Sequence, residues 1–471
     1  MLRAAVRNLP RMQYISTRGG VDPVSFTRSV TMGMADDGGL LLPETVPDVR
    51  DRLAAWRSLP YVDLAQAVMR LFVDIPDGEL APLLRRSYAA FTHPEIAPVT
   101  PVGNLHVLEL FHGPTLAFKD IALQFLGNLF ERVLAAEGAE MNILAATSGD
   151  TGSAAIHGVR GRDRIRIFVM HPHGRTSRIQ ALQMTTVADA NVFNLAVQGT
   201  FDDCQAIMKR LFGDLDLKRR LCLGSVNSIN WARLLAQVVY YFHAAFRVMD
   251  RTGASRVQFS VPTGNFGDIF AGYLAWRMGL PISRLVLATN ENDILARFFQ
   301  AGDYSLGRVV PTLSPSMDIQ VASNFERYLY YRLGEDAGRV AALMSEFSGT
   351  GRLAWNAARQ GPDPVIVSGA GDRESTLQEI REVYERDGYL LDPHTAVGVS
   401  VARRFVTATE PMICLATAHP AKFPEAIREA VGRDVARHPA VDALEGLPSR
   451  CEIVPASVDS VRHYLQDHVR D

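Results

Sequence analysis

From residue 141 onward, the chain alternates short apolar runs with segments of helical periodicity. The runs Met141–Ala146 and Ile165–Met170 have the length of buried strands, and each is followed by a polar loop and a helical pattern. Strand, loop and helix in regular alternation are typical of βαβ units, which build a parallel sheet. A second series of this kind begins at Arg256–Val261. The alternation therefore predicts an α/β fold with two open parallel-sheet domains.

The expected elements cover most of the chain after residue 90. We predict strands at residues 106–111, 141–146, 165–170, 191–197, 256–261, 284–288, 364–367 and 412–417, and helices near residues 179–184, 202–212 and 375–386, with others beginning near residues 119, 153 and 268. Ser375 and Gln378 have the spacing of a capping box. Earlier residues contain the turn-rich segment Asp37–Glu44 (DGGLLLPE), and we expect them to form an N-terminal cap.

Composition limits the classes of partner. The chain has 471 residues, of which 47% are hydrophobic and 21% charged, and its formal net charge is −2. This length suits two or three domains, and a charge near zero gives no general reason to expect nucleic acid or an anionic membrane as partner. The most apolar stretches, such as Leu234–Phe246, are interrupted by polar residues and fall short of a membrane span.

Neither the cysteines nor the first residues indicate export. The cysteines form no C-x-x-C pair and fit a reducing cytosol; they are Cys204, Cys222, Cys414 and Cys451. No H-x-x-x-H spacing supports a metal, so we predict no metal site. The first eleven residues include three arginines but no apolar secretory segment, and we interpret Met12 as an alternative start.

The segment Phe111–Asp120 (FHGPTLAFKD) places Lys119 where an expected strand gives way to an expected helix. An ammonium packed among apolar groups at a helix N-terminus is disfavoured by desolvation and by the helix dipole. Its pKa should therefore fall, and its neutral amine should become a nucleophile suited to a Schiff base. From this segment alone, a surface lysine in the first helical turn is an equally open interpretation.

Three polar loops follow expected strands or precede expected helices. The glycines of Val261–Asp268 (VPTGNFGD) let backbone N–H groups converge on an anion at a helix N-terminus, although the loop is neither a Walker A nor a G-x-G-x-x-G motif. Thr147–Gly152 (TSGDTG) suits a carboxylate. Ser225–Arg233 (SVNSINWAR) offers amides, a hydroxyl and an arginine to a phosphate. Each loop alone could equally be a structural turn or a helix cap.

Taken together, the segments resemble the threonine synthases in their longer form, which are pyridoxal-phosphate enzymes of fold type II. The shared segments occur in the family's order over most of the chain; they are YISTRG, DGGLLLPE, FHGPTLAFKD, TSGDTG, HPHGRTS, SVNSINWAR, VPTGNFGD, PTLSPSMDIQVASNFER, DPHTAVG and TAHPAKFP. The resemblance implies the tryptophan synthase β-like architecture. It suggests a cap at 1–90, a large cofactor-binding domain at 91–125 and 236–471, and a small domain at 126–235.

The resemblance implies pyridoxal 5′-phosphate as cofactor and places residues around it. Lys119 would be the catalytic residue and carry the cofactor as a Schiff base. Thr417 would face the pyridine nitrogen. Asp150 stands where many relatives carry Asn beside the cofactor's 3′-oxygen, and repulsion between two negative oxygens argues against direct contact unless a proton is shared. The cofactor phosphate would lie against Gly264, Asn265, Phe266, Gly267 and Asp268.

The resemblance also implies a reaction and a substrate site. The reaction converts O-phospho-L-homoserine and water to L-threonine and phosphate. Ser148, Gly149 and Thr151 would receive the substrate carboxylate, and the substrate phosphate would be bound by Asn227, Ser228 and Arg233. We expect this small molecule as the partner of a cytoplasmic monomer or homodimer, without nucleic acid or membrane partners.

Three other functions remain possible on the same residues. A phospho-amino-acid lyase would use Lys119 but eliminate without adding water, releasing a keto acid and ammonia. A threonine or serine dehydratase would have no use for a second phosphate site. A non-catalytic cofactor-binding homologue or metabolite sensor would have no need of Lys119 and Arg233.

Overall fold

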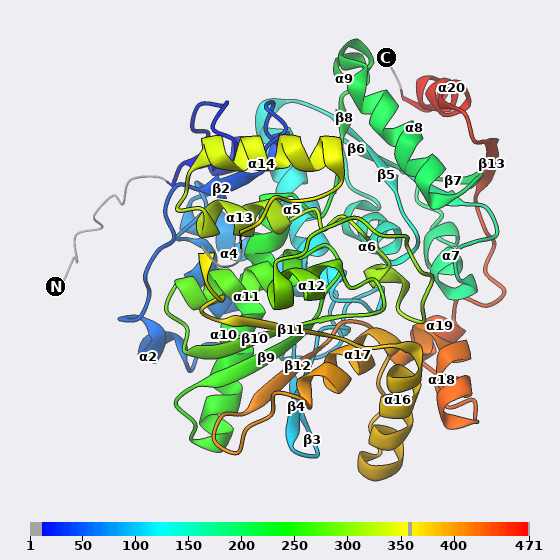
Figure 1. Cartoon of the computed structure of the whole chain (residues 1–471). Helices are drawn as coiled ribbons and strands as arrows, with labels where there is room; N and C mark the ends of the chain where they lie inside the picture. Colours follow the sequence, from blue (N-terminus) through cyan, green and yellow to red (C-terminus); the bar gives the residue numbers. More distant parts are fainter. Residues whose placement is uncertain (1–11, 357–359, 470–471) are drawn as a thin grey trace.

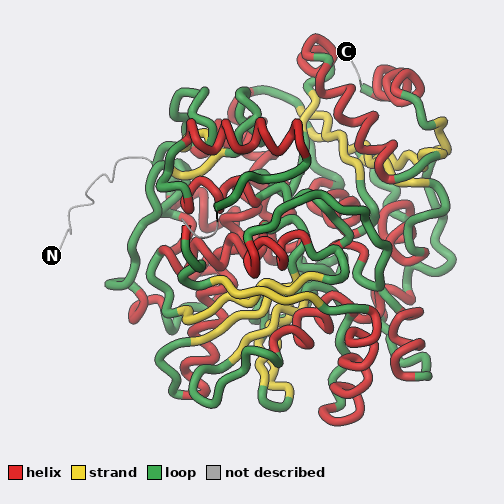
Figure 2. The backbone as a smooth tube through the Cα atoms, in the orientation of Figure 1, coloured by secondary structure: helices red, strands yellow, loops and turns green. Residues whose placement is uncertain are grey.

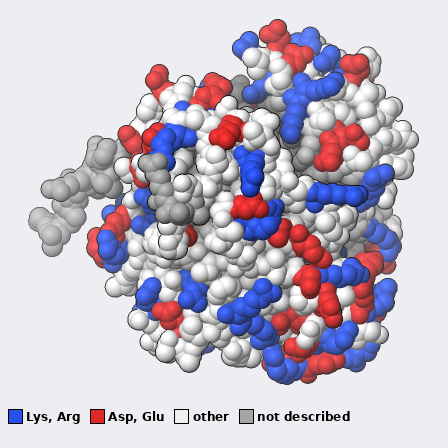
Figure 3. Space-filling model, in the orientation of Figure 1, with Lys and Arg blue, Asp and Glu red and all other residues white. Residues whose placement is uncertain are grey.

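The computed structural model describes residues 12–356 and 360–469, and its two open parallel sheets confirm the predicted fold class (Figures 1 and 2). The interpretation of Met12 as an alternative start concerns residues 1–11, which lie outside the described residues. On the face shown in Figure 3, basic and acidic side chains are interspersed rather than segregated, as the small net charge suggests. Among the described residues, the longest apolar helices are too polar or too short to cross a bilayer.

The larger sheet has six strands in the order β11-β10-β9-β12-β4-β3. All neighbours are parallel except β3 and β4, which form an antiparallel hairpin at one edge. The strands are β3 (Val99–Val102), β4 (Leu105–Glu109), β9 (Val257–Pro262), β10 (Ile282–Thr289), β11 (Ile366–Ala370) and β12 (Met412–Ala416). In β9 and β12 every residue is buried, as expected for strands covered on both faces.

The smaller sheet has five parallel strands in the order β13-β7-β6-β5-β8. They are β5 (Met141–Ala146), β6 (Ile165–Pro172), β7 (Val192–Gln198), β8 (Leu223–Gly224) and β13 (Glu452–Pro455). The sequence analysis assigned all of 236–471 to the large domain, but β13 completes the small sheet. Its signal was weak because the strand is short and mostly exposed. The other domain boundaries stay predictions.

Helices cover both sheets and form the rest of the core (Figure 1). Around the small sheet and between the sheets lie α5 (Lys119–Glu137), α6 (Asp150–Val159), α7 (Arg178–Thr185), α8 (Phe201–Gly213), α9 (Leu215–Arg220), α10 (Trp231–Thr252) and α20 (Val458–His468). The remaining helices are α11 (Gly267–Arg277), α12 (Ile294–Ala301), α13 (Phe325–Arg332), α14 (Ala337–Thr350), α16 (Arg373–Asp387), α17 (Pro393–Ala402), α18 (Pro424–Val431) and α19 (Pro439–Asp442), with the short 3₁₀ turns η1 (Pro315–Met317) and η2 (Pro420–Lys422).

The N-terminal cap is a separate layer of short elements. It contains β1 (Tyr14–Ser16), α1 (Phe26–Met32), β2 (Leu41–Pro43), α2 (Leu53–Trp56), α3 (Tyr61–Met69) and α4 (Asp77–Tyr88). β1 and β2 pair antiparallel, while α3 packs on α10 and α4 on α5. The cap therefore covers the helices that begin at the segments singled out in the sequence.

Two buried helices cross at an unusually close distance. A Cβ built on Gly127 of α5 would lie 1.9 Å from the carbonyl oxygen of Gly158 in α6, and one on Gly158 would lie 2.5 Å from the carbonyl oxygen of Leu123. Only glycine at both positions permits this approach. The contact fixes the middle of α5 against the C-terminal end of α6, the two helices that begin at Lys119 and Asp150.

One predicted cap was wrong. The capping box of α16 is formed by Asp372 and Ser375, whose side chains each accept from the other's backbone N–H, and not by Ser375 and Gln378. Asp372 is the better N-cap because its carboxylate accepts a hydrogen bond from the backbone at the positive end of the helix.

Candidate active site

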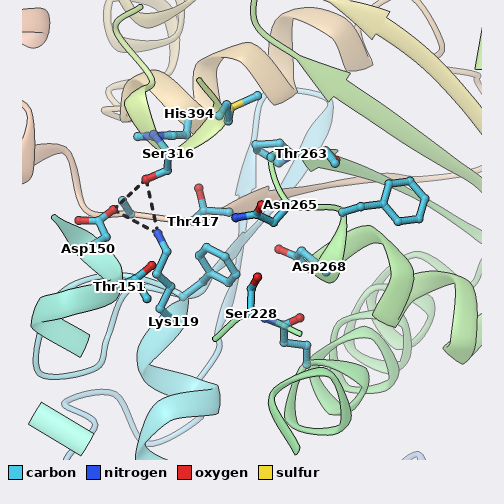
Figure 4. A pocket seen from close by; sticks show the side chains of 18 of the residues that line it. Lys119, Asp150, Thr151, Ser228, Thr263, Asn265, Asp268, Ser316, His394 and Thr417 are labelled. Carbon is cyan, nitrogen blue, oxygen red and sulfur yellow. Dashed lines mark hydrogen bonds and ion pairs between the residues drawn. The ribbon is translucent and has the colours of Figure 1, made fainter. Parts of the chain in front are cut away.

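A pocket lies where the carboxyl ends of β9 and β12 meet the first residues of α5, α6, α10 and α11 (Figure 4). Ligands of open parallel sheets bind at this edge of the strands. Most of the residues predicted from the sequence line it: Lys119, Asp150, Thr151, Ser228, Arg233, Gly264, Asn265, Phe266, Gly267, Asp268 and Thr417. Loops from distant parts of the chain therefore converge on one site.

Backbone hydrogen bonds hold the loop before Lys119 against the end of β12. The Phe118 N–H donates to the carbonyl of Thr417 (2.8 Å), and the His419 N–H donates to the carbonyl of Leu116 (3.0 Å). Leu116 has a φ of 59°, a strained value for a branched residue, which turns the chain into α5. This pairing fixes Lys119 and Thr417 on the same wall of the pocket.

Lys119 is the first residue of α5 and is only 9% exposed. Its Nζ lies 3.4 Å from Oδ2 of Asp150 and 3.5 Å from Oγ of Ser316. Burial lowers the pKa of Lys119; Asp150 opposes this shift, while the positive charges of Lys422 and Arg233 add to it. Lys119 therefore lies at the start of a helix, as predicted, and its pKa is lowered, as predicted.

Asp150 is held by two buried donors that the sequence analysis did not identify. Its Oδ1 accepts from Nε2 of Gln180 (2.8 Å) and lies 2.8 Å from Nζ of Lys422, whose side chain is fully buried. Burial alone would raise the pKa of Asp150, but Lys422 and Lys119 hold it well below its usual range. The site therefore contains a permanently ionised carboxylate. Its relation to the cofactor's 3′-oxygen stays a prediction.

The glycine-rich loop leads from β9 directly into α11, which begins at Gly267. Phe266 caps the helix in the left-handed conformation, with a φ of 63°. A Cβ on Gly264 would lie 2.6 Å from the carbonyl oxygen of Ser316, so a side chain there would displace that segment. The loop thus offers backbone N–H groups at the positive end of a helix, an arrangement that binds phosphate.

Arg233 lies in the first turn of α10, lines the same pocket as this loop and is 4% exposed. One guanidinium nitrogen donates to the carbonyl of Val226 (2.9 Å), but the buried Nε has no hydrogen-bond partner. Within the described part of the chain Arg233 forms no ion pair, and burial lowers its pKa to about 10. A buried cation without a counter-ion is costly, and it indicates a site built for an anionic ligand.

The glycine-rich loop and the segment before α10 are joined by Asn324, which is fully buried. Its Nδ2 donates to the carbonyls of Asn265 (3.1 Å) and Ser228 (3.3 Å). The hydroxyl of Ser228 lies 3.0 Å from that of Ser323, which in turn donates to Oδ1 of Asn265 (3.3 Å). A displacement of one segment is therefore transmitted to the other.

Three residues predicted to bind substrate do not line the pocket. Ser148 and Asn227 are exposed, and Gly149 is buried behind the loop, where Oγ1 of Thr147 accepts its N–H (3.0 Å). Thr151 alone of the carboxylate loop reaches the pocket wall. The roles of Ser148, Gly149 and Asn227 stay predictions.

Several pocket residues were missed by sequence reasoning. His394 lies at the start of α17, with Nδ1 2.9 Å from Oδ1 of Asp392, and its Nε2 accepts the backbone N–H of Ser316 (3.3 Å). Gln237 lies one turn after Arg233 on α10, and its buried Oε1 has no partner. The segments 311–327 and 392–398 resemble those of the family, but nothing in their spacing indicates which of their residues reach the pocket.

Three family models match the chain. Residues 13–88 match the N-terminal region of threonine synthase, residues 395–465 its C-terminal region, and residues 95–355 the pyridoxal-phosphate dependent enzymes. The threonine synthase of Pseudomonas aeruginosa is 48% identical over 470 residues, covering 97% of this chain and 98% of the relative. The chain belongs to the threonine synthase family.

Solved structures of threonine synthases have the same fold. The pyridoxal-phosphate-bound threonine synthase of Brucella melitensis superposes with a TM-score of 0.93 at 44% identity, covering 98% of this chain and all of the other. The yeast threonine synthase gives a TM-score of 0.92 at 40% identity, with 97% and 99% covered. The resemblance inferred from the sequence segments is thereby confirmed, including a pyridoxal-phosphate dependent family.

Proposed function

We propose that the chain converts O-phospho-L-homoserine and water to L-threonine and phosphate, with pyridoxal 5′-phosphate as cofactor. One observation carries the proposal: a buried lysine of lowered pKa shares a single pocket with two separate anion sites. One is the glycine-rich loop at the start of α11, and the other is Arg233 with its unpaired Nε. A phosphorylated substrate and a phosphorylated cofactor require two such sites at once.

The residues present fit the cofactor. Lys119 would hold it covalently, the loop from Gly264 to Asp268 would hold its phosphate, and Thr417 would face its ring nitrogen. When bound, the cofactor withdraws electrons from the bonds at the substrate Cα, which makes the neighbouring C–H bonds more acidic. A neutral hydroxyl at Thr417 would moderate this effect, because it leaves the ring nitrogen less firmly protonated than a carboxylate would.

The side chains of the pocket account for the remaining steps. Once displaced from the cofactor, the neutral amine of Lys119 serves as the base that takes the proton from Cα. After giving up that proton it is a neutral amine again and takes the proton from Cβ. Arg233 and Ser228 hold the phosphate on Cγ, which departs after the Cβ proton has been removed. Water then adds its hydroxyl at Cβ and gives its remaining proton to the departed phosphate, while Lys119 returns one proton to Cγ and one to Cα.

The substrate carboxylate is assigned to the loop at the start of α6. Thr151 already lines the pocket, and Ser148 and Gly149 would reach the carboxylate when the small sheet moves toward the large one. Closure of this kind would also admit water once and otherwise exclude it. We further propose a cytoplasmic monomer or homodimer; the four cysteines, all of them free, fit a reducing compartment.

Phosphate release coupled to threonine detection tests the proposal. Wild type should form both products in equal amounts, and Lys119→Ala should form neither. Lys119→Arg is the matched control, since it keeps a cation beside Asp150 but offers no nucleophile; it should fold normally and remain inactive. Turnover by either variant would refute the assignment of Lys119.

The rival lyase is separated by the same assay. A phospho-amino-acid lyase would release phosphate with a keto acid and ammonia rather than threonine. The second anion site at Arg233 favours a phosphorylated substrate in both cases, so only the product decides between them.

A further inference from the structure

The side chain of Asp268 occupies an unexpected position for a carboxylate. Asp268 is the second residue of α11, lines the pocket beside the glycine-rich loop and is 7% exposed. Figure 4 shows its carboxyl group on the same side of the pocket as Asn265. Its backbone N–H belongs to the anion-binding helix end, so its side chain must coexist with whatever anion is bound there.

The two oxygens of this carboxyl group have different surroundings. Oδ1 accepts hydrogen bonds from the hydroxyls of both Tyr240 and Tyr241 on α10. Oδ2 is buried and has no hydrogen-bond partner, and within the described residues Asp268 forms no ion pair. One half of the group is therefore fixed by donors, while the other half is left unpaired.

An ionised Asp268 would conflict with a phosphate in the loop. Two negative groups in a buried site repel each other, and among the described residues Asp268 forms no ion pair that would offset the repulsion. A carboxylic acid removes this repulsion, because a proton on Oδ2 supplies a hydrogen-bond donor where the structure has an unpaired atom. Burial favours the same form: it raises the pKa of Asp268 to about 6, although the two tyrosines oppose the shift.

We propose that Asp268 binds the cofactor phosphate as a neutral carboxylic acid that donates from Oδ2, so that cofactor binding takes up a proton. The proposal rests on the proposed cofactor but not on the reaction. The titratable groups that face Asp268 are Tyr240 and Tyr241, and the other charged or titratable groups of the pocket are Lys119, Asp150, Arg233 and His394. Burial and the two tyrosines account for the shift in the pKa of Asp268.

The sign of the pH effect follows from linkage. Below about pH 6 the free protein already holds the proton, and binding is independent of this group. Above that pH the proton must be acquired on binding, so the dissociation constant of the cofactor should rise with pH, by up to about tenfold for each unit. Asp268→Asn keeps the shape and provides a permanent neutral donor, so it should bind the cofactor without this loss.

The experiment measures cofactor dissociation by absorbance from pH 6 to pH 9 for wild type and Asp268→Asn, without substrate. Calorimetry in buffers of different ionisation enthalpy counts the protons; above about pH 7, wild type should take up close to one more per cofactor than the variant. The proposal would be overturned if the dissociation constant had the same pH dependence in wild type and Asp268→Asn and both proteins took up the same number of protons per cofactor. A failure of the proposed reaction would leave both readouts unchanged, because neither involves turnover.

Two further variants guard against a folding defect. Tyr241→Phe removes a donor that stabilises the carboxylate, so the rise in dissociation constant should begin at a higher pH. Asp120→Asn is the matched control: Asp120 is another buried carboxyl whose pKa burial raises to about 6, but both of its oxygens are bonded to Thr115. In Asp120→Asn the dissociation constant of the cofactor should rise with pH as it does in wild type. A dissociation constant that does not change with pH in this variant would mean that Asp120, and not Asp268, takes up the proton.

Discussion

Lys422 and Asp150 form an ion pair of 2.8 Å in which neither side chain is more than 3% exposed. Lys422 also donates to the carbonyl of Thr115 (2.7 Å), in the loop that leads to Lys119. The pair therefore connects η2, α6 and the start of α5, three segments that are far apart in the chain. Because it fixes the charge of Asp150, it also sets the electrostatic surroundings of the amine of Lys119.

Lys422→Met should destabilise the protein by about 3 to 5 kcal/mol, since the buried carboxylate loses its shorter ion pair and keeps only the longer one to Lys119, at 3.4 Å, within the described residues. The double variant Lys422→Met, Asp150→Asn should recover part of this loss, because it removes the uncompensated charge as well. Urea unfolding of the four proteins of this cycle measures the coupling. Additive effects would show that the two groups do not act as a pair.

Arg233→Met should separate stability from activity. Within residues 12–356 and 360–469 the buried guanidinium has no counter-ion, so replacing it with an apolar side chain should raise the melting temperature. The same change should lower kcat/KM for phosphohomoserine by about thirtyfold or more, because a buried charge-assisted contact of about 2 kcal/mol is lost. A variant that is both less stable and fully active would contradict the assignment of this residue to a ligand site.

Gly127→Ala should destabilise the crossing of α5 and α6, since the new Cβ would collide with the carbonyl of Gly158. Overpacking of this kind costs about 1 to 3 kcal/mol. Gly78→Ala in α4 is the control, because nothing lies within 4 Å of its Cβ position. The control should gain about 0.5 to 1 kcal/mol from its better helix propensity. Thermal unfolding compares the two, and equal effects would be evidence against the close contact.

Asp120→Asn should make the free energy of unfolding depend less on pH in the acid range. Burial raises the pKa of Asp120 to about 6 in the folded protein, so protonation stabilises the folded form. This contribution is complete below the unfolded pKa of about 4 and disappears as the pH rises through about 6. Wild type should therefore lose stability between those pH values relative to the variant, as followed by urea unfolding. A larger slope in the variant would show that Asp120 is ionised in the folded state.

The local parts of the site were predictable, because they depend on short segments. Lys119 was expected at the first turn of a helix with a lowered pKa, since an apolar helical pattern follows it directly in the chain. The glycine-rich loop was recognisable for a similar reason: its two glycines stand between a strand and a helix. Both expectations require only the neighbouring residues and general rules of helix termini.

The contacts that cross the structure were not predictable. Lys422 looks like an ordinary lysine in the sequence, and its complete burial depends on how η2 packs against α6. Ser316 and His394 reach the pocket because the segments 311–327 and 392–398 meet there, where the backbone N–H of Ser316 donates to Nε2 of His394. The strand β13 was missed for a related reason, since its partner lies in a distant part of the chain. Periodicity carries no information about such pairings.

The position of β13 has a consequence for synthesis of the chain on the ribosome. β7 is complete when residue 198 has been made, but its partner strand Glu452–Pro455 is made only much later in translation. Until then one edge of the small sheet is exposed, and an unpaired edge strand is a template for aggregation. Protein made without residues 452–471 should therefore accumulate in inclusion bodies, and nascent chains should need chaperone protection until β13 has emerged.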